Sequence, residues 1–158
     1  MKGSHRIIVE SRKVKYDFTV KRNITILTGD SGSGKTVLME LIRDYRRYGA
    51  DSGVQVSCDC ECRTIENEDW ERTIQEASPC IFFIDEGNRF LYTKNFARAV
   101  QQSEHYFVIA TREKLPMLPY SMNEIYGFRK SGKFHEAKQT YNAFTEILQK
   151  VKKLHRNL

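Results

Sequence analysis

The sequence predicts an α/β domain in which a mainly parallel sheet lies between two layers of helices. Two apolar runs, residues 80–85 and 106–111, lack the alternation of a half-exposed strand and are typical of parallel strands covered on both faces. Segments with helical spacing separate the expected strands, and this alternation of strands and helices predicts three layers. A chain of 158 residues has the length of one domain with a single core.

Local patterns predict the remaining elements. A short run at 6–10 and the alternating apolar residues of 14–20 predict an N-terminal β-hairpin. Residues 24–28 form a β-rich run, and the apolar residues after it recur at helical spacing as far as Gly49, the expected C-terminal cap. The other expected elements are strands at 54–62 and 125–129, helices at 67–77 and 94–103, and a basic C-terminal helix within 131–158.

Charge is distributed unevenly along the chain, whose formal net charge is +6. Residues 1–22 carry seven basic and two acidic side chains, and residues 127–158 carry eight and two, so the middle of the chain is acidic. Basic ends favour contact with nucleic acid or with an acidic protein, although a solvated face produces the same pattern. The chain has no apolar run that could span a membrane and no secretory signal, which predicts a cytoplasmic protein.

Three of the four cysteines are two residues apart: Cys58, Cys60 and Cys62. This crowding does not resemble a secreted disulfide framework and agrees with a reducing compartment. On a strand, alternate residues project from one face about 6.5–7 Å apart, and here they share that face with Val54 and Val56. We therefore expect small core side chains rather than metal ligands, and the four histidines show no ligand spacing with them.

Residues 29–36 read GDSGSGKT and fit the phosphate-binding loop pattern without substitution, between an expected strand and an expected helix. Glycines let successive backbone N–H groups turn toward one anion, and the helix N-terminus adds its positive dipole end. Lys35 is expected to reach the β- and γ-phosphates, and the Thr36 hydroxyl to ligate Mg²⁺. The predicted nucleotide-binding residues are Gly29, Asp30, Ser31, Gly32, Ser33, Gly34, Lys35 and Thr36.

An acidic pair, Asp85 and Glu86, ends the apolar run at 80–85. Open α/β sheets bind their ligands at the carboxyl ends of the strands. Asp85 is therefore expected to hold Mg²⁺ together with Thr36. Glu86, one residue further, is suited to orient or deprotonate the water that attacks the γ-phosphate.

With both motifs in place, residues 20–130 resemble the P-loop NTPases. The resemblance is to the large division with an extra strand between the two motifs, which includes the AAA+, RecA-like, ABC and HerA/FtsK-like ATPases. It implies a mainly parallel five-stranded sheet in the order 5-1-4-3-2, in a three-layer P-loop fold. It also implies a γ-phosphate sensor at the polar residue that ends strand 4, which is Thr111 here.

The resemblance implies an ATPase with ATP and Mg²⁺ as its cofactors and with Lys35, Glu86 and Thr111 as catalytic residues. The absence of an Asn-Lys-x-Asp guanine-reading motif favours ATP over GTP. The expected organisation is a single P-loop domain over 1–158. Its parts are the N-terminal hairpin at 1–22, the nucleotide-binding core at 23–130 and the C-terminal extension at 131–158.

Two alternative functions stay open at this point. The segment IDEGNRF at 84–90 is also similar to the corresponding segment of thymidine kinase-like enzymes, so a nucleoside or nucleotide kinase is an alternative function. The cysteines of this chain, however, do not supply the zinc site of those enzymes. The chain could also be an ATP-dependent switch that binds nucleic acid or a protein. An oligomer could supply an arginine finger, for which the candidates are Arg89, Arg98, Arg112 and Arg129.

Overall fold

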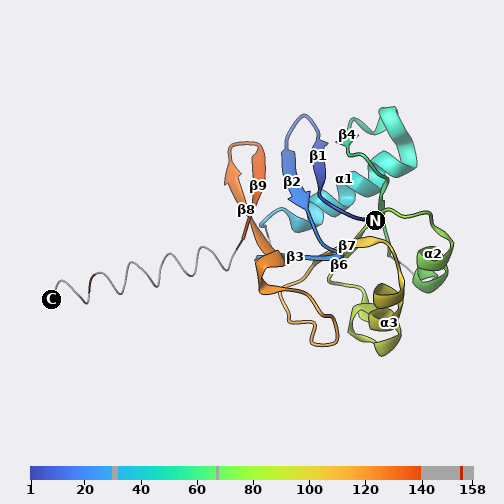
Figure 1. The fold of residues 1–158 in the computed structure, drawn as a ribbon. Coiled ribbons are helices and arrows are strands. Elements are labelled where there is room, and N and C mark those ends of the chain that lie inside the picture. The colour runs from blue at the N-terminus through green and yellow to red at the C-terminus, as the bar shows by residue number, and fades with distance from the viewer. Residues whose placement is uncertain (30–31, 67, 140–153, 155–158) are drawn as a thin grey trace.

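The computed structural model describes residues 1–29, 32–66, 68–139 and 154 (Figure 1). In these residues the strands are β1 (His5–Glu10), β2 (Lys15–Val20), β3 (Ile24–Thr28), β4 (Gln55–Ser57), β5 (Cys62–Thr64), β6 (Ile81–Asp85), β7 (Tyr106–Ala110), β8 (Ile125–Ser131) and β9 (Phe134–Gln139). The α-helices are α1 (Lys35–Tyr48), α2 (Trp70–Glu76) and α3 (Lys94–Gln102). Short 3-10 turns cover Gly49–Ser52, Arg89–Tyr92 and Met122–Glu124.

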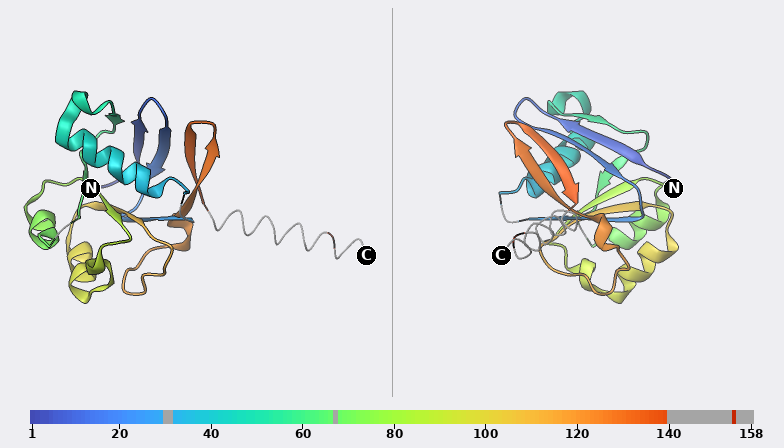
Figure 2. Two further views of the ribbon diagram at one scale, coloured as in Figure 1. Left: turned by 180° about the vertical axis from the view of Figure 1, so that it is seen from behind. Right: turned by 60° about the vertical axis from the view of Figure 1, so that its left-hand side comes forward.

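All nine of these strands belong to one mixed sheet, in the order β4-β1-β2-β9-β8-β3-β7-β6-β5. Pairing is parallel from β8 through β3, β7 and β6 to β5, and also between β2 and β9. It is antiparallel between β1 and β2, between β1 and β4, and between β8 and β9. The two hairpins are therefore continuous with the central strands in the order of the sheet, and both views in Figure 2 show the two hairpins side by side.

Chain connectivity forces this sheet to curl. The first and last strands in the order, β4 and β5, are joined only by residues 58–61. If the sheet were flat, these strands would lie about 38 Å apart, because neighbouring strands are about 4.8 Å apart. Five residue steps, from Ser57 to Cys62, span at most about 18 Å. The two margins must therefore approach each other, which gives the sheet the form of a curled half-barrel.

The predicted fold class is wrong. We expected a mainly parallel sheet of five strands within a three-layer P-loop fold, and the structure has a curled mixed sheet of nine strands with three short helices in the described residues. The difference arises because β2 and β9, which are more than a hundred residues apart, pair with each other and join the N-terminal hairpin to the central strands. Local periodicity identifies a strand but does not report its partner. The predicted basic C-terminal helix lies outside the described residues.

The single strand predicted at 54–62 is also wrong. The structure divides it into β4, which pairs with β1, and β5, which pairs with β6 at the other end of the sheet. Residues 58–61 between them belong to neither strand. Alternation of apolar and polar residues continues through this break, so the pattern alone predicts one uninterrupted strand.

Two apolar clusters cover the two faces of the central strands. On one face, Leu38 and Ile42 of α1 pack with Phe83 of β6 and with the buried side chains of β1 and β2. On the other face, Phe82 of β6 packs with Phe96 of α3 and with the buried residues of α2. Successive residues of β6 thus enter different clusters, which explains the apolar run without alternation.

Candidate functional site

The carboxyl ends of β3, β6 and β7 meet at one edge of the sheet. Leu27 of β3 pairs with Ala110 of β7, and Ala110 pairs in turn with Asp85 of β6. The three segments that follow these residues are the ones in which the sequence predicted catalytic and phosphate-binding side chains. Parallel pairing in this register therefore brings those segments side by side.

All three glycines of the loop at 29–36 have a positive φ, that of Gly32 being +90°, and two of them also lie close to other side chains. Gly29 has φ of +136° and Gly34 has φ of +100°, in the region that side chains with a Cβ disfavour. A Cβ at Gly34 would lie 2.9 Å from the Tyr16 hydroxyl oxygen, and a Cβ at Gly29 would lie 3.1 Å from Cβ of Ser33. The motif glycines thus permit both the turn and the close approach of neighbouring side chains. Asp30 and Ser31 lie outside the described residues.

The start of α1 offers polar groups toward the loop. Gly34 is its N-cap and supplies no side-chain hydrogen bond to the first amides of the helix, which are the donors that an anion can use. Lys35 is buried, and its ammonium group donates a hydrogen bond to the backbone oxygen of Gly29. The buried hydroxyl of Ser33 has no hydrogen-bond partner among the described residues. A phosphate group is a ligand that would satisfy these donors together.

Thr36 and Asp85 line the same cavity of about 140 Å³ beside the loop. The cavity has room for a cation with several waters. Its wall also includes Thr64, the last residue of β5, and Glu66, two residues further along the chain. The carboxylate of Glu66 lies 2.8 Å from Arg43 Nη1 of α1. The structure thus brings the two predicted metal ligands to one space.

Sequence reasoning missed Thr64 and Glu66 as neighbours of this cavity. The available signal was the expectation of parallel pairing, because β5 runs parallel to β6 and ends at the same edge of the sheet. This expectation did not identify Thr64 and Glu66, because the single strand predicted at 54–62 ended before both residues.

Glu86 directly follows β6, and its carboxylate contacts Arg112 beyond the end of the neighbouring strand β7. Its Oε2 accepts a hydrogen bond of 3.1 Å from the backbone N–H of Arg112, and its Oε1 lies 3.7 Å from Arg112 Nε. The preceding carboxylate, that of Asp85, accepts a hydrogen bond of 2.9 Å from the Glu86 N–H. The Asn88 side chain donates to the Asp85 backbone oxygen and so fixes the turn.

The Thr111 hydroxyl is engaged within its own loop. It donates to the backbone oxygen of Glu113 at 3.2 Å and accepts from the Glu113 N–H at 3.0 Å. The Thr111 N–H continues the β3–β7 pairing by donating to the oxygen of Leu27. Thr111 is therefore at the predicted place along the chain, and its role as γ-phosphate sensor stays a prediction.

Side chains from distant strands also touch the loop. The Tyr16 hydroxyl of β2 donates a 2.7 Å hydrogen bond to the Gly34 oxygen, and the ring of His135 stacks on Tyr16 with centroids 4.7 Å apart. Burial raises the pKa of Tyr16 to about 12, so its hydroxyl remains a donor at neutral pH. The ammonium of Lys130 in β8 donates to the Gly32 oxygen. No local sequence pattern predicts these contacts. The stacking of His135 on Tyr16 depends on the β2–β9 pairing, and Lys130 lies on β8, which pairs with β3.

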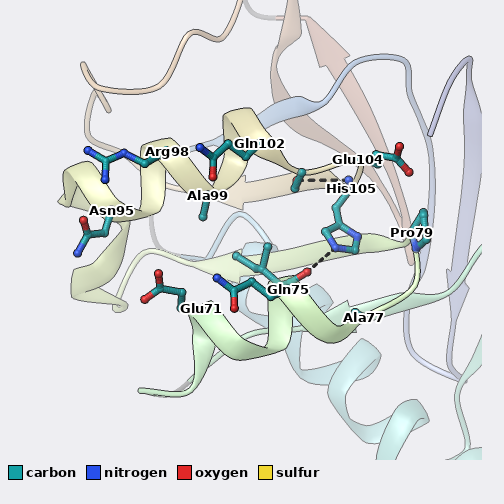
Figure 3. A pocket seen from close by; sticks show the side chains of 12 residues that line it. Glu71, Gln75, Ala77, Pro79, Asn95, Arg98, Ala99, Gln102, Glu104 and His105 are labelled. Carbon is teal, nitrogen blue, oxygen red and sulfur yellow. Dashed lines mark hydrogen bonds between the residues drawn. The ribbon is translucent and has the colours of Figure 1, made fainter.

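Of the four candidate arginine fingers, Arg112 lies at the site, next to Glu86. Arg89 and Arg129 are exposed, and Arg98 lines a different cavity of about 410 Å³ between α2 and α3 (Figure 3). The larger cavity lies beside His105, just before the amino end of β7, and thus at the opposite end of that strand from the loop at 29–36.

His105 has a structural role in this second cavity. Its Nδ1 accepts a hydrogen bond from the Cys80 N–H at 3.2 Å. Its Nε2 donates to the oxygen of Ile74 at 2.8 Å (Figure 3). Both ring nitrogens are thus occupied by backbone groups. The histidine thus joins the end of α2 to the residue before β6.

The chain matches no protein-family model, and no curated protein is significantly similar to it in sequence. In the described part of the chain, no helix has both the length and the apolar character that crossing a bilayer requires.

Proposed function

We propose that the chain binds ATP with Mg²⁺ and hydrolyses the bond to the γ-phosphate. The observation that carries the proposal is the meeting of Thr36 and Asp85 at one cavity beside the glycine loop and the buried Lys35. A hydroxyl and a carboxylate are oxygen ligands that suit Mg²⁺. The unpartnered Ser33 hydroxyl and the uncapped amides of α1 fit a phosphate group as well.

Each of these residues has a distinct task in the proposed reaction. Bound Mg²⁺ would neutralise charge that develops on the phosphate oxygens. The Lys35 ammonium exchanges its bond to the Gly29 oxygen for bonds to phosphate, and the loop amides orient the group for in-line attack. Glu86, positioned by the Arg112 N–H, accepts a proton from the attacking water.

The test is ATP binding by calorimetry and phosphate release with and without Mg²⁺, for the wild type and two variants. Lys35→Ala should weaken ATP binding at least about a hundredfold, because the buried ammonium is the principal positive charge in the loop. Glu86→Gln should bind ATP with near wild-type affinity and lower turnover by about a hundredfold or more, since it removes the base alone.

Matched controls are Lys133→Ala, an exposed lysine in the β8–β9 turn, and Glu71→Gln, an exposed carboxylate of α2. Both should leave binding and turnover unchanged. Absence of binding heat from the folded wild type would refute the nucleotide site. Wild-type turnover in Glu86→Gln would refute only the base, and phosphate transfer to an added nucleoside without release to water would identify a kinase.

A further inference from the structure

A second cluster of side chains lies where the two edge strands of the sheet, β4 and β5, approach each other. It joins His5 at the start of β1 to three residues of the connection between β4 and β5: Cys58, Asp59 and Cys60. Ligand atoms of His5, Asp59 and Cys60 all lie within 4.8 Å of one another. None of these residues belongs to the proposed nucleotide site.

Strand pairing explains why the cluster forms. β1 and β4 are antiparallel, with Ile8 opposite Ser57 and Val9 opposite Val56. Extending this register beyond Ser57 places Cys60 opposite His5, on the same side as the buried residues of β1. The break in the strand after Ser57 then lets Cys58 and Cys60 turn toward each other, so that their sulfur atoms lie 3.7 Å apart. In a regular strand, alternate residues are about 6.5–7 Å apart.

Three of the distances between the ligand atoms are close to those of a tetrahedral metal site. With bonds of about 2.3 Å to sulfur and about 2.0–2.1 Å to nitrogen or oxygen, a tetrahedral Zn²⁺ separates two sulfurs by about 3.8 Å and a sulfur from a nitrogen or oxygen by about 3.5 Å. Here Cys58 Sγ is 3.7 Å from Cys60 Sγ and 3.7 Å from Asp59 Oδ1, and Cys60 Sγ is 4.0 Å from His5 Nδ1. On binding, the hydrogen bond of 2.7 Å from His5 Nδ1 to Asp59 Oδ1 must lengthen. Cys58 Sγ must also turn toward His5, because Cys58 lies outside the group of ligand atoms that are within 4.8 Å of one another.

The chemistry of the donor set selects the metal. Thiolates and an imidazole prefer a borderline-soft divalent cation such as Zn²⁺, whereas Mg²⁺ prefers oxygen ligands alone. The His5 side chain is 12% exposed and the Asp59 side chain is 66% exposed, so the site has a buried side and an open side for entry. On binding, the two thiols lose their protons to solvent, and the imidazole proton moves from Nδ1 to Nε2.

From this geometry we infer that His5, Cys58, Asp59 and Cys60 form a zinc site that ties the N-terminal strand to the connection between the two margins of the sheet. The role is structural, since all four positions are filled by protein ligands. The site is independent of the proposed nucleotide site and can be present or absent without it.

The experiment is a Zn²⁺ titration of the reduced full-length protein against a chromogenic chelator, in excess Mg²⁺ so that oxygen-only sites are occupied. We expect one Zn²⁺ per chain. Replacing both ligating cysteines, in Cys58→Ser with Cys60→Ser, should weaken binding by about a hundredfold or more, and His5→Gln by about tenfold or more. Cys80→Ala, which removes a buried thiol outside the cluster, should bind Zn²⁺ like the wild type.

A second readout does not depend on the folding of variants. Co²⁺ added to the reduced wild type should give the ligand-field bands of a tetrahedral ion and thiolate-to-cobalt charge-transfer absorption, and Zn²⁺ should displace it. The melting temperature of the wild type should rise with added Zn²⁺. A wild type that binds no Zn²⁺, a cobalt spectrum without thiolate bands, or wild-type affinity in the double cysteine variant would each overturn the inference.

Discussion

Tyr16 supports the phosphate loop from a strand that belongs to a different part of the sequence. The side chain is fully buried, its hydroxyl donates to Gly34, and His135 stacks on its ring. The contact is so close that position 34 has no room for a Cβ. The conformation of the loop therefore depends on β2 and β9 as well as on its own glycines.

Removing the Tyr16 hydroxyl should weaken both folding and nucleotide binding. In Tyr16→Phe the ring still fills its space, but the Gly34 oxygen loses a hydrogen bond, so urea unfolding should report a loss of about 1 kcal/mol. We expect ATP affinity, measured by calorimetry, to fall several-fold because the loop loses a support.

Tyr106→Phe is the matched control for this change. Its hydroxyl also donates to a backbone oxygen, that of Gly3 at 2.7 Å, but at the opposite end of the sheet from the loop. A similar loss of stability with unchanged ATP affinity is expected. Equal effects of both variants on ATP affinity would contradict a specific support of the loop by Tyr16.

Site residues that belong to a local sequence motif were the ones that the sequence could predict. Lys35, Thr36 and Asp85 follow from spacing and from their places beside strands, and the structure brings Thr36 and Asp85 to one cavity. His135 could not be predicted, because it reaches Tyr16 and the loop through the β2–β9 pairing, which spans more than a hundred residues. Lys130 lies on β8, the expected neighbour of β3, but no spacing in the sequence indicates its contact with Gly32. The approach of His5 to Cys60, 55 residues away in the sequence, likewise depends on a strand pairing, that of β1 with β4.

At the scale of elements, α2 is attached to the sheet through His105. Helix α2 is only seven residues long, so the backbone oxygens of its last turn depend on partners outside the helix. The oxygen of Ile74 finds that partner in His105 Nε2. The same ring accepts the N–H of Cys80 just before β6, so one side chain satisfies backbone groups on two elements.

Replacing His105 with phenylalanine should destabilise the protein by about 2 kcal/mol or more, because two buried backbone groups lose their partners while the ring volume is retained. Denaturant unfolding measures this loss. The control is Gln102→Ala, an exposed side chain at the rim of the same cavity, which should change stability by less than about 0.5 kcal/mol. A His105→Phe protein as stable as the wild type would show that water replaces the imidazole.

Elements with a single periodic pattern were predicted better than elements whose pattern continues through a break. The apolar runs at 80–85 and 106–111 are strands β6 and β7, buried on both faces. The alternation at 54–62 gave no sign that the chain leaves one margin of the sheet at Ser57 and enters the other at Cys62. Pairing, which involves remote residues, decides where such a strand ends.

For the whole molecule, the distribution of charge supports an anionic partner, and we propose that the basic ends bind nucleic acid. Replacing Lys150, Lys152 and Lys153 with glutamine should weaken binding of a labelled DNA or RNA oligonucleotide. If all three contact phosphates of duplex DNA, the slope of log K against log salt should become less negative by about 2.7.

Fluorescence anisotropy at a series of salt concentrations measures that slope. Glutamine at Lys94 and Lys114, in the acidic middle of the chain, serves as the control and should leave it unchanged. A wild type that binds neither DNA nor RNA at low salt would contradict the proposal.

The architecture as a whole could not be predicted from sequence, although most of its strands could. Each strand pattern is compatible with several partners, and the choice between five strands and nine depends on pairings such as Lys15 with Phe134. The resemblance to P-loop NTPases covered residues 20–130 and carried no information about how the strands outside that range join the sheet.

The two outermost strands, β4 and β5, are only three residues long each. Another protein molecule can extend an open β-sheet only by forming hydrogen bonds with the unpaired backbone groups of an edge strand. Edge strands of three residues offer few free amide and carbonyl groups for this. Concentrated solutions of the folded protein should therefore resist fibrillar association through this sheet.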